Sequence, residues 1–437
     1  KQMVSGFQLW FLFAMDRRSK KMTTIPLQST DQIAVVKPTM GLIHKLAWWS
    51  MLALIFQIPW GNGLWDGIAK VLALITFAFA GLLLVTRGTH KHFSFFNLMA
   101  LVLGCWHLVA LWWAPDHTYG IKAANTFTQL VLMSFVYAFL INDAYKLRLA
   151  YLAYVSGAIV AFGIIFSNFL RGINGPYYNR FTIENIETDS MAIILSLAIP
   201  MAVWLYTQYK NPIAKALSLM CVPIIFYGIF LTGTRTGLVT GMVGIMYLGF
   251  TQRKAPINLK IIYAALLVGL ITAVISLAPK ESVERIFSIG QAIQSGDLNS
   301  REVIWQFSIE SWKENPIIGG GTGSLGHGLN RFHVEFKSAH NSYVQILTEH
   351  GLIGLGLYLV MLGSLMYYIF QCPVETKIFL MALFMTIAVS QLSLHSHKVK
   401  EVWFVWSIIA AHGHFFARMR GQVYDRYQRF YGQQQYG

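Results

Sequence analysis

The amino-acid sequence predicts an all-α polytopic membrane protein with about 12 transmembrane helices and one large helical loop between spans 9 and 10. The chain is 55% hydrophobic and only 12% charged, with a mean hydropathy of +0.50. Soluble domains carry about 25% charged residues. The apolar runs are close to 20 residues long and do not alternate with polar residues, so they favour helices over the strands of a barrel.

The predicted elements follow the apolar runs. We expect membrane spans near residues 42–60, 64–86, 93–114, 121–141, 147–170, 190–207, 213–231, 236–250, 260–278, 352–370, 377–394 and 401–417. The domains are then an N-terminal cytoplasmic arm 1–40, helices 1–9 in 41–278, a loop domain 279–340, helices 10–12 in 341–418 and a cytoplasmic tail 419–437. Met22 is an alternative start, with residues 1–21 as an upstream extension.

The basic residues predict the orientation of these spans. If the N-terminus is cytoplasmic, the inner connections hold 21 Lys and Arg residues and the short outer connections hold seven. Inner loops carry this excess in membrane proteins, and long loops are left out of the comparison because they cross regardless of charge. The loop domain 279–340 is therefore expected on the outer side.

The same composition excludes other classes of protein. A net charge of +15 in a soluble protein would suggest a nucleic-acid partner, but here the basic residues punctuate apolar runs, so membrane orientation explains them and no nucleic acid is expected. Cys105, Cys221 and Cys372 fall in or beside apolar runs without CxxC spacing. They indicate neither a disulfide framework nor a zinc site.

Within the loop domain the sequence predicts one well-defined helix. Asn299 is a suitable N-cap with Glu302 three residues later, and the helix should run to Glu314, where Asn315-Pro316 ends it. The glycine-rich run 319–323 must be loop. A second helix is expected to start near His340 and to feed the next membrane span.

Four outer arginines are candidate binding residues. Arg171 and Arg180 flank a loop, Arg235 lies in the turn Thr-Gly-Thr-Arg-Thr-Gly, and Arg301 lies in the first turn of the predicted loop helix. Guanidinium groups match phosphate oxygens in pairs, and helix N-termini add backbone donors. The pattern predicts a site for a diphosphate headgroup. The alternatives are interfacial anchors, and for Arg301 an ion pair with a nearby glutamate.

His340 is the candidate general base. At a helix start the helix dipole disfavours the imidazolium, so the ring should stay neutral and able to take a proton from a hydroxyl. The alternative is a histidine that only caps or packs. His327, His333 and His350 lack the spacing of a metal set, and His395-Ser396-His397 has only Glu401 as a nearby carboxylate. We expect no metal and no cofactor.

The outer residues resemble the O-antigen ligase/polymerase superfamily of bacterial membrane glycosyltransferases. The resemblance covers residues 230–355 most strongly. It is carried by Thr232 to Gly237, by Arg301…Trp305…Asn315-Pro316-Ile317-Ile318-Gly319-x-Gly321, and by His340-Asn341-Ser342-Tyr343…Glu349-His350-Gly351-Leu352-Ile353-Gly354.

The resemblance implies a GT-C-like fold and metal-independent transfer of a glycan from a polyprenyl diphosphate to a hydroxyl on the periplasmic side. Arg235 and Arg301 would bind the diphosphate and His340 would activate or position the hydroxyl, which makes these three the expected catalytic residues. Arg180, Arg171, Asn341 and Tyr343 are the expected substrate-binding residues. Direct attack would invert the anomeric configuration.

Within the superfamily the single late loop and compact length favour the O-antigen ligase. The expected partners are an undecaprenyl-diphosphate-linked O-antigen donor, a lipid A-core acceptor and membrane lipids, and the expected location is the bacterial inner membrane. An O-antigen polymerase and a protein O-oligosaccharyltransferase use the same donor and remain open. A transporter of the lipid-linked glycan is the alternative of another class, although transporters usually show internal repeats.

Overall fold

The computed structural model describes residues 41–61, 66–87, 93–175, 179–258, 279–287, 301–332 and 338–434, together with scattered positions between 260 and 277. The chain divides into residues 1–41 and a compact unit of residues 42–437, and the description that follows concerns the second unit. The predicted arm 1–40 and most of the predicted span 260–278 lie outside the described residues.

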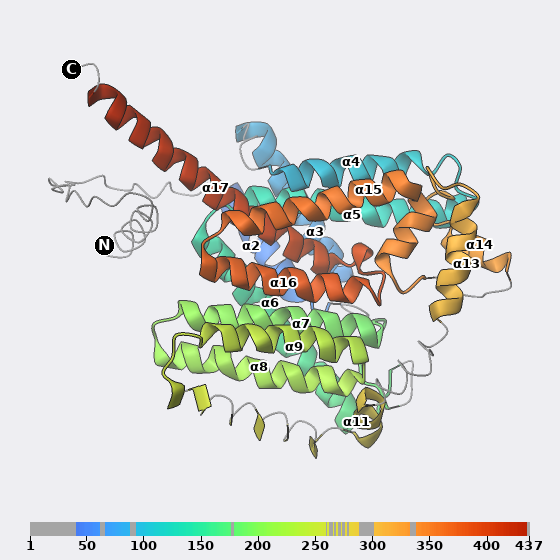
Figure 1. Cartoon of the computed structure of the whole chain (residues 1–437), viewed down its shortest axis with the longest axis horizontal. Coiled ribbons are helices and arrows are strands. Elements are labelled where there is room, and N and C mark those ends of the chain that lie inside the picture. Colours follow the sequence, from blue (N-terminus) through green and yellow to red (C-terminus); the bar gives the residue numbers. More distant parts are fainter. Residues whose placement is uncertain are drawn as a thin grey trace. The chain divides into compact units, whose positions relative to one another are not determined.

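The described residues form helices and no strands (Figure 1). The elements are α2 (Leu42–Gln57), α3 (Asp66–Arg87), α4 (Phe95–Val109), α5 (His117–Leu140), α6 (Ala144–Leu170), α7 (Thr188–Gln208), α8 (Pro212–Thr232), α9 (Arg235–Thr251), α11 (Lys280–Phe287), α13 (Arg301–Lys313), α14 (Leu325–Asn330), α15 (Ser342–Gln371), α16 (Val374–Gln391), the short 3₁₀ helix η4 (Ser396–Lys398) and α17 (Lys400–Gln434). Every predicted span except 260–278 coincides with one of these helices.

The described residues contain seven helices that are long and apolar enough to cross a membrane, namely α3, α5, α6, α7, α8, α15 and α16. Two shorter apolar helices, α2 and α4, accompany them. The all-α polytopic class is therefore confirmed, whereas the number of twelve spans and the predicted domain boundaries stay predictions. Helix α17 continues to Gln434, through most of the segment predicted as a tail.

Helix α7 lies at the centre of the packing. In its most apolar stretch 78% of the residues are buried, against 17% in α3. It packs against α6, α8, α9 and α16, and Figure 1 shows α7, α8 and α9 side by side. Because close packing on several sides fixes a helix, a residue at the end of α7 has a well-defined position.

A tight turn joins α8 to α9. Gly233 adopts a left-handed conformation (φ 62°) and ends α8, and Thr234 then caps α9 by accepting a hydrogen bond from the Gly237 N–H at 3.1 Å. Glycine tolerates this backbone conformation at a helix end, and threonine supplies the capping oxygen. The turn 232–237 therefore forms a tight corner, with Arg235 as the first residue of α9.

The glycine-rich loop docks against a break in α15. Gly351 has a non-helical backbone (φ 63°, ψ −163°), and the Leu352 N–H donates to the Pro316 carbonyl at 2.9 Å instead of to its own helix. A side chain on Gly319 would collide with the backbone of residues 349–351. Two of the sequence motifs, 315–321 and 349–354, thus pack directly against each other, and this contact is called the glycine-rich joint.

Candidate active site

Arg180 is fixed between two helices. It lies in the loop before α7 and is 5% exposed. Its Nε donates to the Thr232 carbonyl at the end of α8 (3.0 Å), and its Nη2 donates to Oδ1 of Asp189 (2.9 Å). A cation at a helix C-terminus is favoured by the helix dipole. The predicted binding residue Arg180 is therefore held in place, with its Nε and Nη2 both donating to protein acceptors.

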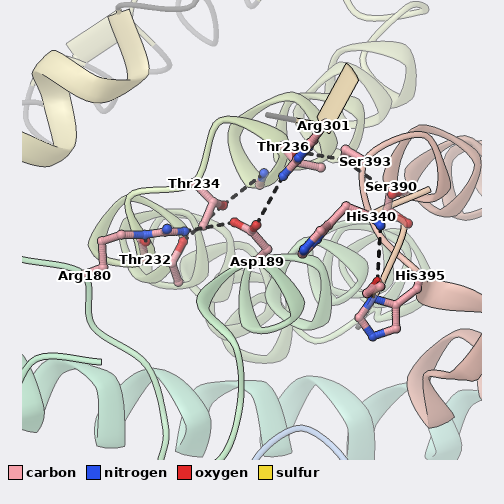
Figure 2. Close-up of polar contacts among 12 residues, drawn as sticks. Arg180, Asp189, Thr232, Thr234, Thr236, Arg301, His340, Ser390, Ser393 and His395 are labelled. Atoms are coloured by element: carbon pink, nitrogen blue, oxygen red, sulfur yellow. Dashed lines mark hydrogen bonds and ion pairs between the residues drawn. The ribbon is translucent and has the colours of Figure 1, made fainter. Parts of the chain in front are cut away.

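Asp189 joins Arg180 to Arg301. It lies in the first turn of α7, where the dipole favours a carboxylate. Its Oδ2 is 3.6 Å from Nη2 of Arg301, the first residue of α13. Figure 2 shows the carboxylate between the two guanidinium groups. Two arginines that are 121 positions apart in the chain, Arg180 and Arg301, thus meet on one carboxylate.

Arg235 begins α9 beside this cluster. Its neighbours Thr234 and Thr236 both lie in the close-up, and Thr236 Oγ1 is 2.8 Å from Ser393 Oγ (Figure 2). The Arg235 side chain is partly buried. Its position at the corner of α8 and α9, next to Thr232, brings it to the same end of the helices as Arg180.

His340 immediately precedes the N-cap of a helix, where the sequence predicted a helix start. Asn341 caps α15, and His340 has a left-handed backbone with φ 47°. Its Nδ1 is buried and accepts no hydrogen bond. Burial lowers the pKa of His340 and the charge of Arg301 lowers it further, while Glu187 and Asp189 oppose the shift. The neutral imidazole that the sequence predicted thus has burial and a neighbouring cation as its physical cause.

A serine and a second histidine support the His340 backbone. The His340 N–H donates to Ser338 Oγ at 3.2 Å, and the same oxygen is 2.8 Å from Nδ1 of His395. The rings of His340 and His395 are 6.2 Å apart. Burial lowers the pKa of His395 to about 4, helped by the charge of Lys398. His395 is thus an uncharged part of the wall of this site.

The other predicted substrate-binding residues have structural contacts. Asn341 Oδ1 accepts from the N–H groups of Tyr343 and Val344, and its amide nitrogen donates to the Leu392 carbonyl at 3.4 Å. The Tyr343 ring packs edge-on to Tyr358 at 6.1 Å. These contacts account for the side chain of Asn341 and for the ring of Tyr343, and their role in substrate binding stays a prediction.

Arg171 stands apart from the cluster in the described contacts. It follows the last residue of α6 and is exposed. In the part of the chain that the structure describes, the ion pairs of Asp189 are with Arg180 and Arg301 and do not include Arg171. The structure therefore brings together Arg180, Arg301 and His340, with Arg235 at the adjoining corner, and leaves Arg171 outside.

Three members of the cluster were missed from sequence: Asp189, Ser338 and His395. Asp189 carries a usable signal, because it is a carboxylate at the start of an apolar run, nine positions after Arg180. Ser338 and His395 carry none, since their contact joins segments 57 positions apart. Among the described residues no three His, Cys, Asp or Glu side chains are grouped as a metal site would require.

The chemistry of the cluster is that of an anion site beside a base. Guanidinium groups bind oxyanions through paired hydrogen bonds, and a neutral histidine can accept a proton. Figure 2 shows the His340 ring turned toward Asp189 and Arg301, so both functions meet in one place. The site can therefore stabilise a leaving anion and deprotonate a hydroxyl.

No curated protein matched the chain. A chain from a solved structure of a peptidoglycan synthase complex, described as coordinating polymerization and crosslinking, aligns with 17% identity over 72% of this chain and 96% of its own length. Its TM-score of 0.43 is too low to support an assignment.

The family comparison covers the site directly. Residues 219–359 match the family model described as O-antigen ligase. The matched range includes the 232–237 corner, α13 with Arg301, the glycine-rich joint and His340. The resemblance to the O-antigen ligase superfamily is thereby confirmed over residues 219–359.

Proposed function

We propose that this chain is a metal-independent glycosyltransferase that ligates O-antigen polysaccharide from undecaprenyl diphosphate to lipid A-core in lipopolysaccharide biosynthesis. The observation that carries the proposal is the meeting of Arg301 and His340, both within the matched residues 219–359, with Arg180, which Asp189 joins to Arg301. The work would take place on the periplasmic side of the bacterial inner membrane.

The reaction uses each group in a distinct way. The acceptor hydroxyl oxygen attacks the anomeric carbon of the donor sugar and forms the new glycosidic bond. The bond from that carbon to the diphosphate oxygen breaks, and the oxygen leaves with the electron pair. His340 takes the hydroxyl proton and later releases it to water. Attack from the face opposite the diphosphate inverts the anomeric configuration.

The arginines stabilise the leaving group. Negative charge grows on the diphosphate as its bond to carbon breaks, and Arg235, Arg301 and Arg180 would supply the compensating positive charge. Preorganised donors of this kind act in the transition state and lower the barrier by several kcal/mol. A glycosyltransferase that relies on guanidinium groups in this way would need no divalent cation.

Two rivals share the donor. An O-antigen polymerase would transfer the chain to a second lipid-linked glycan, and a protein O-oligosaccharyltransferase would transfer it to a hydroxyl side chain of a protein. The ligase is favoured by the large loop domain that the sequence predicts at residues 279–340. A transporter of the lipid-linked glycan would form no new bond.

The test is an assay with defined components. Purified chain in nanodiscs is mixed with undecaprenyl-diphosphate-linked O-antigen and lipid A-core, with and without EDTA, and the products are separated on a gel. We expect ligated lipid A-core in both samples. Product only on a second lipid-linked glycan or on an added protein would identify the rivals, and magnesium-restored activity after EDTA would contradict the arginine mechanism. Glycan that crosses liposomes without a new bond would identify a transporter.

A further inference from the structure

The Asp189–Arg301 pair joins two parts of the helical unit. Helix α13, which carries Arg301, packs on α14 and α15. Asp189 belongs to α7, which packs on α8 and α9. The ion pair links these two groups of helices and places the Arg301 guanidinium on the same carboxylate as that of Arg180.

The two contacts of the carboxylate are unequal. Oδ1 is 2.9 Å from Arg180, whose side chain is 6% exposed and which also donates to the Thr232 carbonyl. Oδ2 is 3.6 Å from Arg301, whose side chain is 20% exposed. Arg180 is thus bound firmly, whereas the contact of Arg301 is longer and its side chain is more exposed to solvent. Both oxygens are engaged by cations, so neither is placed to take a proton from an acceptor.

An incoming diphosphate would meet these contacts in a definite order. Two guanidinium groups brought together repel each other unless an anion lies between them, and Asp189 supplies that anion. A diphosphate carries more negative charge than one carboxylate, and its oxygens fit the guanidinium fork equally well. The longer contact to Arg301 is the one that such an oxyanion weakens more, because Arg180 is bound at a shorter distance and keeps its second acceptor at Thr232.

We propose that Asp189 is a positioning residue: it shares Arg301 with the diphosphate of the donor and keeps that guanidinium beside Arg180 throughout the transfer. This inference rests on the proposed function and assigns a role to a residue outside the matched range 219–359. Asp189 competes with the diphosphate in the ground state and keeps Arg301 in the place where the transition state needs it.

The competing explanation is an ion pair that only stabilises the fold. A fold-stabilising pair would change the amount of folded protein and would leave the kinetic constants of the folded fraction unchanged. Loss of a positioning residue instead changes kcat and the donor KM differently. Misplacement of Arg301 lowers kcat, whereas loss of a competing anion leaves the donor KM unchanged or lowers it.

The test uses the full chain in nanodiscs and three variants. Asp189→Asn removes the charge at nearly constant shape, Asp189→Glu keeps the charge, and Glu184→Gln removes an exposed carboxylate from the same segment as a matched control. Folding is checked by size-exclusion chromatography. Asp189→Ser, a residue well suited to a helix start, is made in parallel and decides by the same criteria if Asp189→Asn is not folded.

Initial rates are measured against donor concentration, and the binding of undecaprenyl diphosphate is measured separately. For Asp189→Asn we expect kcat at least tenfold below wild type, with a donor KM and an undecaprenyl diphosphate Kd equal to or below those of wild type. Asp189→Glu should recover kcat to within about threefold of wild type, since it restores the charge. Glu184→Gln should match wild type in every constant.

Three results would overturn the proposal: an unchanged kcat in folded Asp189→Asn, a Kd or KM that rises tenfold in that variant, or a folded Asp189→Glu that recovers nothing. The wild-type control distinguishes failure of the Asp189 proposal from failure of the proposed function. Wild-type protein that neither binds undecaprenyl diphosphate nor transfers glycan refutes both, whereas active wild type with an equally active Asp189→Asn refutes the role of Asp189 alone.

Discussion

At the scale of single residues, His340 combines three properties that rarely occur together. It has a left-handed backbone, a buried Nδ1 without a partner and an arginine close enough to lower its pKa. Strained backbone and unsatisfied polar atoms are costly, and proteins keep them mainly where a function requires them. The residue is therefore the best place to test the chemistry.

His340→Ala is expected to abolish glycan transfer while the protein stays folded and inserted, because no other described group at this place pairs a neutral imidazole with Arg301. Transfer is measured on the ligation gel and folding by size-exclusion chromatography. His327→Ala is the matched control, since His327 is exposed on α14. Normal product from His340→Ala would remove this residue from the mechanism.

The pH dependence follows from the direction of the pKa shift. The base must be neutral, and a histidine is neutral above its pKa. Because burial and Arg301 lower the pKa of His340 below 6.5, activity should persist to a more acidic pH than for an unperturbed histidine. Glu187 and Asp189 moderate the shift, and the neighbouring His395 stays uncharged over the same range. A profile of kcat/KM should place the acid limb below 6.5, and a limb above 6.5 contradicts the assignment.

Arg301→Ala should lower kcat/KM for the donor by about 100- to 1000-fold. Removal of one preorganised oxyanion donor typically raises the activation barrier by about 2.7–4 kcal/mol. Arg235→Ala is expected to behave alike. Arg331→Ala is the control, because Arg331 forms an exposed pair with Glu314 and such pairs contribute little. Full turnover of Arg301→Ala at low donor concentration would exclude it from diphosphate binding.

The residues of the site could be predicted in part. Arg180, Arg301 and His340 could be singled out from the sequence by their side-chain chemistry and by their places in an outer loop or at a predicted helix start. Asp189 is a carboxylate at the start of an apolar run, but the sequence does not show that it contacts Arg301, which lies 112 positions later in the chain. A single sequence gives the chemistry of a side chain but not its partner, and this is why the pair was missed.

At the scale of helices, the apolar runs predicted positions well because the length of a span and the absence of charges both limit where a helix can lie. Asn315-Pro316 was expected to end the loop helix, and α13 does end at Lys313. A helix start was expected near His340, and α15 does begin at Ser342, with Asn341 as its cap. The break at Gly351 inside α15 had no sequence signal apart from the glycine itself.

That break gives a prediction for the joint between the glycine-rich loop and α15. Gly351→Ala should lower the melting temperature and the transfer rate, because a side chain there would collide with the Ile317 carbonyl and the backbone has a positive φ. Gly356→Ala lies in the same helix with open space around it and should be neutral or slightly stabilising. Thermal unfolding in detergent measures both. Equal melting temperatures for the two variants would show that the joint is not needed.

At the scale of the whole molecule, the proposed site requires a defined orientation. The cluster lies where α7 and α9 begin, and the other ends of these helices carry Arg253 and Lys254 next to Glu375. Basic residues gather on the cytoplasmic side of membrane proteins. The ends with Arg253 and Lys254 should therefore face the cytoplasm, and Arg301 and His340 should face the periplasm.

Cysteine labelling tests this orientation. In a variant without Cys105, Cys221 and Cys372, a single cysteine is placed at Ile317 or at Lys254, which are 61% and 81% exposed. A membrane-impermeant maleimide added to intact spheroplasts should label Ile317→Cys but not Lys254→Cys, and permeabilisation should expose the second. The reversed pattern would put the arginines and His340 on the cytoplasmic side, where a lipid-linked glycan already moved to the periplasm could not reach them, and would refute ligation as the function.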